Sequence, residues 1–146
     1  MSEANKRQIG GTHYKTSYEH WDMVLDAGLG YLDGCATKYV ARWRKKDGAK
    51  DLEKALHYVE KLIETHALGD VPKHQARGCA EKFAEINGLD FTERACLIMI
   101  CEKTQKSLVV AANMIRLLLS EITPQQRTDP TGQDHPFGYQ PEKDLS

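Results

Sequence analysis

Apolar residues recur along this chain at the three- and four-residue spacing of amphipathic helices, not with the alternation typical of strands. Most of the helical stretches are bounded by residues that commonly start or stop helices, such as Ser17, Gly28 and Gly88. Asp90, with Glu93 three residues on, resembles a capping box at the start of a helix. The expected helices cover about residues 17–28, 31–46, 49–65, 75–87, 90 onward and 107–121. The pattern therefore predicts an all-α fold of five to six helices.

The helices expected over residues 31–46 and 49–65 are separated only by a break at Asp47-Gly48. Such a short break joins two long helices as an antiparallel hairpin, on which we expect the fold to be built. Gly69 and Pro72 indicate a linker after this hairpin. The expected organisation is a helical domain over residues 9–66, a helical extension over 75–122, and a flexible, disordered or loosely docked tail over 123–146.

Composition excludes some classes of function. The formal net charge is −1, with 20 Lys and Arg against 21 Asp and Glu, so the overall charge predicts neither nucleic acid nor an anionic membrane as a partner. No apolar run reaches the length of a membrane span, and the N-terminus has no signal-peptide pattern. The four cysteines form no CxxC pair, which favours small buried thiols in a reducing cytoplasm.

The apolar residues also bear on assembly. They are spread over several short helices, and some large ones exceed what a single small core absorbs. This surplus predicts a homo-oligomer, in which neighbouring subunits can complete a groove whose halves are helices. The residues in question are Trp21, Trp43, Met99 and Met114.

Candidate chemistry is concentrated in the hairpin, where five of the nine residues from Lys38 to Lys46 are basic. Helical spacing arranges side chains in stripes, and antiparallel packing would bring the basic stripes to one groove. Arginine binds phosphate with a two-pronged fork, lysine adds point charges, and aromatic rings can stack on a base. The alternative is a solvated charged face. The stripes are Lys38, Arg42 and Lys45; Tyr39, Trp43 and Lys46; and Lys54, Tyr58 and Lys61, with His57 adjacent.

Three aspartates, Asp33, Asp47 and Asp51, lie near this cluster in the sequence. Asp51 falls in the first turn of a helix, where it can orient Arg42 or Lys38, or help to hold a metal ion. The alternative is the ordinary preference of acidic residues for helix N-termini. The sequence carries no P-loop, no GxGxxG, no HExxH and no GxSxG motif, and no Cys/His pair with zinc spacing, so we assign no metal site.

Residues 9 to about 66 resemble a small helical domain encoded by phages. The likeness rests on Ile9-Gly10-Gly11-Thr12-His13-Tyr14, Lys38-Tyr39-Val40-Ala41-Arg42, Lys46-Asp47-Gly48, Asp51-Leu52-Glu53-Lys54-Ala55 and Tyr58. One branch of this family is a phage nucleotide kinase that acts on deoxynucleoside monophosphates without a P-loop. The resemblance implies nucleotide chemistry in the cytoplasm of an infected bacterium.

The resemblance also implies a site. Its catalytic residues would be Lys38, Arg42 and Asp51, and a nucleoside triphosphate would be the phosphate donor. A requirement for Mg²⁺ stays open, because no motif indicates one. Two alternatives are a protein that binds and sequesters a host signalling nucleotide without turnover, and a module that binds protein or nucleic acid. The expected phosphate- and substrate-binding residues are Gly10, Gly11, His13, Tyr14, Lys38, Tyr39, Arg42, Lys45, Lys46, Lys54 and Tyr58.

Overall fold

The computed structural model describes residues 16–65, 68–69 and 71–122, and these form an all-α fold, as predicted. Within them there is no strand, only an isolated bridge between Gly69 and Thr104. The expected Gly10, Gly11, His13 and Tyr14 site residues and the 123–146 tail lie outside the described residues. The helices are α2 (His20–Ala27), α3 (Tyr31–Arg42), α4 (Ala49–Glu64), α5 (His74–Ile86), α6 (Phe91–Glu102) and α7 (Gln105–Ser120).

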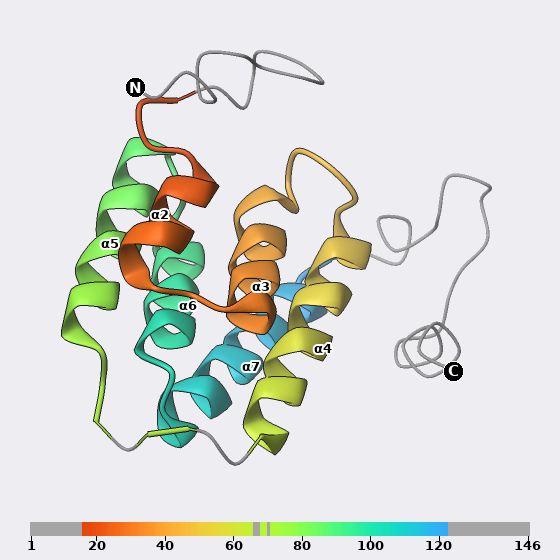
Figure 1. The fold of residues 1–146 in the computed structure, drawn as a ribbon. Helices are drawn as coiled ribbons and strands as arrows, with labels where there is room; N and C mark the ends of the chain where they lie inside the picture. Colours follow the sequence, from red (N-terminus) through yellow and green to blue (C-terminus); the bar gives the residue numbers. More distant parts are fainter. Residues whose placement is uncertain (1–15, 66–67, 70, 123–146) are drawn as a thin grey trace.

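The predicted hairpin is present: α3 and α4 run antiparallel side by side (Figure 1). Helix α7 packs against α4 and α6, while α5, at the left edge of Figure 1, packs against both α2 and α6. One hydrophobic core runs through all six helices and joins the hairpin to the helices that follow the linker. Among its fully buried side chains are Leu52, Leu56, Leu97, Leu108 and Ile115.

Several helix ends follow the sequence signals. Gly28 and Gly88 adopt positive φ angles of 65° and 68°, which L side chains rarely tolerate, and each follows the end of a helix. Asp90 and Glu93 form the expected capping box, in which each side chain accepts a hydrogen bond from the other residue's backbone N–H. Helix α2 begins at His20, after Glu19 and not after Ser17.

The predicted helix over residues 31–46 is wrong at its C-terminal end, because α3 ends at Arg42. Residues 43–48 form turns, and the amide of Gly48 donates to the carbonyl of Trp43 at 2.9 Å. Trp43 itself is buried, and its indole Nε1 donates to Glu93 of α6 at 2.7 Å. This contact, between residues 50 apart in the sequence, joins the turns after α3 to α6.

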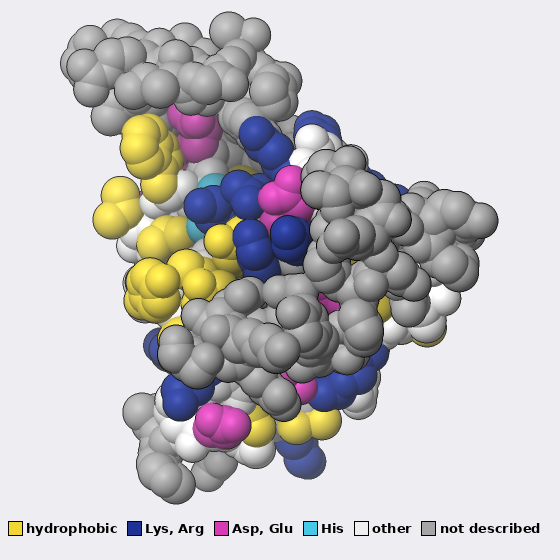
Figure 2. Space-filling model, turned by 90° about the vertical axis from the view of Figure 1, so that its right-hand side faces the viewer, with side chains coloured by type: hydrophobic (Ala, Val, Ile, Leu, Met, Phe, Trp, Pro, Cys, Tyr) yellow, Lys and Arg dark blue, Asp and Glu magenta, His cyan; other side chains and the backbone are white. Residues whose placement is uncertain are grey.

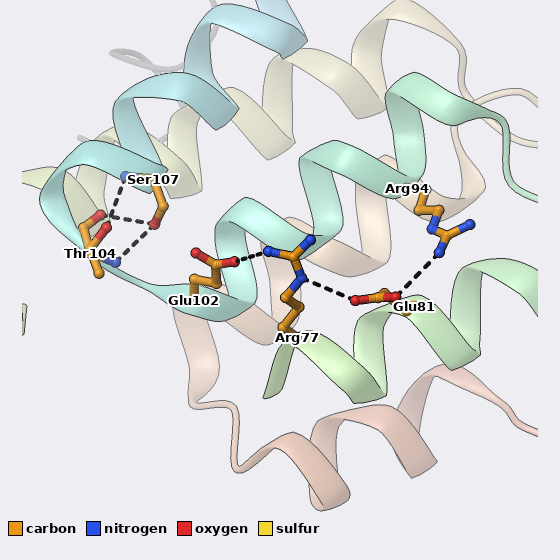
Figure 3. Close-up of polar contacts among 6 residues, drawn as sticks. All are labelled: Arg77, Glu81, Arg94, Glu102, Thr104 and Ser107. Atoms are coloured by element: carbon orange, nitrogen blue, oxygen red, sulfur yellow. Dashed lines mark hydrogen bonds and ion pairs between the residues drawn. The ribbon is translucent and has the colours of Figure 1, made fainter. Parts of the chain in front are cut away.

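The last helix starts at Gln105, earlier than the expected Ser107. Thr104 caps it: its hydroxyl accepts from the Ser107 amide at 2.9 Å, and the Ser107 hydroxyl accepts from the Thr104 amide at 2.9 Å (Figure 3). Figure 3 also shows a chain of ion pairs between α5 and α6, from Glu102 through Arg77 and Glu81 to Arg94. Because most of these groups are partly exposed, we expect each pair to add little stability.

The large apolar residues that predicted an oligomer differ in how far they are exposed to solvent. Trp43 is buried inside the chain, and Met99 and Met114 pack partly against the core. Trp21 is exposed on α2. The homo-oligomer stays a prediction, now without Trp43 as support. None of the helices in the described part of the chain is both long and apolar enough to cross a bilayer.

Candidate functional site

Three cationic side chains surround the ring of Tyr39. The guanidinium carbon of Arg42 lies 4.8 Å from the ring centroid, and the ammonium groups of Lys54 and Lys38 lie 5.4 and 5.6 Å from it. Lys38, Tyr39 and Arg42 belong to α3 and Lys54 belongs to α4, so the hairpin assembles this arrangement. Cations within about 6 Å of an aromatic centroid are attracted by the negative ring face.

Tyr58 of α4 completes this group. Its ring stacks on Tyr39, with centroids 5.9 Å apart and an interplanar angle of 12°. Tyr31, the first residue of α3, meets Tyr58 edge to face at 6.0 Å and 76°. A hydrogen bond with Tyr31, together with burial, raises the pKa of Tyr58 above its ordinary value. We call Lys38, Tyr39, Arg42, Lys54 and Tyr58 the Tyr39 cluster.

Arg42 is held in place by Asp51, a fully buried carboxylate in the first turn of α4. The Nε and Nη2 of Arg42 donate to the two Asp51 oxygens at 3.2 and 3.3 Å. The Asp47 amide also donates to Asp51 at 3.2 Å, and the Asp47 carboxylate lies 3.9 Å from Arg42. Asp51 thus has the orienting role that the sequence suggested, and we treat it as a positioning residue.

The two stripes predicted on the helix over residues 31–46 are interrupted, because α3 ends at Arg42, whereas Lys54, Tyr58 and Lys61 all lie within α4. Lys45 and Lys46 lie in the turns after α3 and are exposed, so they do not continue its face. Trp43, a predicted base-stacking residue, is buried beneath Arg44, whose guanidinium lies 4.3 Å from the indole ring. Arg44 also pairs with Glu93 at 2.8 Å and with Asp90 at 2.7 Å. Trp43 and Arg44 therefore tie the hairpin to α6, and Trp43 offers no surface to a ligand.

The three aspartates do not converge. Asp33 is buried at the start of α3, where one oxygen accepts from the Gly30 amide at 2.8 Å. Its other oxygen lies 3.4 Å from the ammonium of Lys103, at the end of α6. Asp47 and Asp51 lie beyond the opposite end of α3, next to Arg42. No group of three or more His, Cys, Asp or Glu side chains within the described ranges is placed to hold a metal ion.

Figure 2 shows Lys and Arg side chains gathered in the middle of the face where the α3–α4 hairpin lies, with hydrophobic side chains beside them. The cations of the Tyr39 cluster belong to this hairpin. The arrangement offers a phosphate group two ammonium groups and an oriented guanidinium. These cations lie next to the ring of Tyr39, which contacts the ring of Tyr58, and Tyr58 in turn contacts the ring of Tyr31.

Part of this chain matches a known protein family. Residues 11–60 match DUF3310, a family of proteins of unknown function. The DUF3310 segment contains the whole Tyr39 cluster together with Asp51 and Tyr31. It ends within α4, so α5, α6 and α7 lie outside the match. No curated protein and no solved structure matches the chain.

One residue next to the cluster has a role that sequence alone did not reveal. His20 of α2 lies against Phe83 of α5, and its Nε2 is 2.8 Å from the hydroxyl of Thr37 on α3. That hydroxyl is within donating distance of the Asp33 and Gly34 carbonyls, so it accepts from a neutral imidazole. Burial, and then the nearby Lys38 charge, lower the pKa of His20 to about 4.

This contact predicts a pH-dependent stability. The folded pKa of His20 is about 4, below its unfolded value of 6.5, so the unfolded chain binds more protons between these values. The stabilisation is present above pH 6.5 and is lost as the pH falls toward 4. We expect the free energy of unfolding to be about 2 kcal/mol lower at pH 5 than at pH 7 because of this residue.

Urea denaturation at both pH values measures this difference, and His20→Gln supplies the control because glutamine keeps a polar contact without titrating. The difference between pH 7 and pH 5 should shrink by about 2 kcal/mol in the variant. An unchanged difference would show that His20 is not buried in its neutral form.

Proposed function

We propose that this chain is a nucleotide kinase without a P-loop, which transfers a phosphoryl group from a nucleoside triphosphate to a deoxynucleoside monophosphate. The observation that carries the proposal is the Tyr39 cluster, where Arg42, Lys54 and Lys38 lie within 6 Å of one ring centroid. Phosphoryl transfer depends mainly on neutralising the charge of the phosphates and on aligning donor and acceptor. Cationic side chains can do both.

The cluster is organised before a ligand arrives. Asp51 holds Arg42 through Nε and Nη2, which leaves the Nη1 donors outside that pairing. A guanidinium fixed in this way loses little further freedom when it binds a phosphate oxygen. Lys38 and Lys54 approach the same ring from two different helices and add charge that adapts to the ligand. The cluster therefore suits a polyphosphate more than a single weak anion.

In the proposed reaction an oxygen of the monophosphate attacks the γ-phosphorus of the triphosphate. A new P–O bond forms to the acceptor, and the bond between the γ-phosphorus and the bridging oxygen breaks. The electron pair stays on the β-phosphate, and the products are two diphosphates. Lys38, Lys54 and the Arg42 guanidinium would neutralise the charge on the transferring group and the leaving oxygen.

The resemblance to a phage nucleotide kinase branch supports the same proposal, and with it a site of action in the cytoplasm of an infected bacterium. A protein that only sequesters nucleotides would need the same binding contacts without the in-line alignment of donor and acceptor. The two functions differ in one measurable property, which is turnover.

We predict multiple turnover. The protein is incubated with each pair of nucleoside triphosphate and deoxynucleoside monophosphate, with and without Mg²⁺, and diphosphates are quantified by chromatography. We expect diphosphates in amounts far above the protein concentration, from at least one pair. Lys54→Gln should reduce this activity, because it removes a cation from the cluster. Lys82→Gln serves as the matched control, since Lys82 of α5 also lies over a tyrosine ring, that of Tyr18, but is no part of the Tyr39 cluster.

The outcomes separate the functions. Bound nucleotide that is recovered unchanged after denaturation, for every pair, would replace the kinase with a sequestering protein. If the protein bound no nucleotide in the same samples, both functions would be excluded.

A further inference from the structure

The aromatic side chains near the cations differ in how much ring face they leave free. Tyr39 is stacked on Tyr58 and approached by three cations, and Tyr58 is flanked by both Tyr39 and Tyr31. Trp43 is buried under Arg44. Tyr31, in contrast, is 74% exposed to solvent. Of the described aromatic residues around the Tyr39 cluster, Tyr31 is thus the one with a broad ring surface open to a ligand.

Tyr31 is also held at a useful distance from the cations. Its ring centroid lies 6.0 Å from that of Tyr58, which lies 5.9 Å from that of Tyr39. The edge-to-face contact with Tyr58 limits the freedom of the Tyr31 ring despite its exposure. A ligand that spans this path would have an aromatic group at one end and negative charge at the other. A nucleotide has this form, because its base and its phosphates are separated by the sugar.

We propose that Tyr31 is the platform on which the nucleobase stacks while the phosphates occupy the Tyr39 cluster; this inference rests on the proposed function. Stacking on tyrosine is tolerant of base identity, because every base has a π-face. The phenol hydroxyl is not required for it. Tyr31 therefore acts in binding the base and takes no part in neutralising phosphate.

The test compares a ligand that has a base with one that lacks it. ATP and inorganic tripolyphosphate are titrated calorimetrically into the parent protein and into Tyr31→Ala and Tyr31→Phe. Phe91→Ala is the matched control, because Phe91 is also the first residue of a helix and is 84% exposed. Circular dichroism confirms that each variant retains its helices.

We expect Tyr31→Ala to weaken ATP binding by about 5-fold to 150-fold, the range for loss of one base–aromatic stack, and to leave tripolyphosphate binding unchanged. Tyr31→Phe should stay within about twofold of the parent for both ligands, and Phe91→Ala should bind both as the parent does. A loss of ATP affinity without a loss of tripolyphosphate affinity would show that Tyr31 contacts the base and not the phosphates.

Other outcomes overturn the inference in distinguishable ways. Equal losses for ATP and tripolyphosphate in Tyr31→Ala would mean that Tyr31 only supports Tyr58 and the cations. No loss for either ligand would exclude Tyr31 as the platform while leaving the phosphate site intact. A parent protein that binds neither ligand would refute the proposed function itself, and the inference with it.

Discussion

Replacing Glu93 with alanine is expected to lower the free energy of unfolding by about 3 kcal/mol. Glu93 is 3% exposed, and its carboxylate accepts hydrogen bonds from Trp43 at 2.7 Å, from Arg44 at 2.8 Å and from the Asp90 amide at 3.0 Å. Its removal leaves the buried indole N–H of Trp43 without an acceptor. Arg44 loses its buried partner but stays half exposed, so water offsets part of that loss.

Chemical denaturation of Glu93→Ala and Glu81→Ala at neutral pH measures this effect. Glu81 is a fair comparison because it also sits on a helix and pairs with two arginines, but more than a third of its side chain is exposed. We expect Glu81→Ala to be destabilised much less, because both of its ion pairs are screened by solvent. If the two variants were destabilised equally, burial of Glu93 would not be what joins the hairpin to α6.

The second large effect concerns ligand binding. Replacing Arg42 with alanine is expected to weaken nucleotide binding by about 1.5–3 kcal/mol, the range for a hydrogen bond to a charged group. Arg42→Lys should recover only part of this loss, because lysine lacks the planar fork that arginine presents to phosphate. Arg42→Lys also leaves a cation beside the buried Asp51, so it separates loss of the fork from damage to the fold.

Local signals in the sequence predicted the all-α class and several helix ends. The Asp90–Glu93 capping box and the glycine stops at Gly28 and Gly88 depend on residues within a few positions of one another. The buried position of Trp43 was missed because it depends on a partner from α6. Trp43 and Glu93 are 50 residues apart, and the sequence marked Glu93 only as a capping residue.

The candidate site was predicted only in part, again because some of its contacts join residues of different helices. Spacing placed Lys38 and Arg42 together on α3, and the hairpin brought Lys54 to them. Asp33 lies near the cluster in sequence, but tertiary packing pairs it with Lys103 at the end of α6. Tyr31 was not selected, because its position against Tyr58 arises only when the two helices of the hairpin pack. Sequence spacing describes one helix at a time, whereas a site is shared between helices.

Calorimetric titration of ATP into the parent, Arg42→Ala, Arg42→Lys and Arg116→Ala shows whether the Tyr39 cluster binds nucleotide phosphate. Arg116 is an exposed arginine of α7 that pairs with Glu60, so its loss changes the net charge equally without touching the cluster. We expect the parent and Arg116→Ala to bind alike, Arg42→Ala to bind about tenfold or more weakly, and Arg42→Lys to have an intermediate affinity. Binding by Arg42→Ala equal to that of the parent, or no binding by the parent, would mean that the Tyr39 cluster is not a nucleotide-phosphate site.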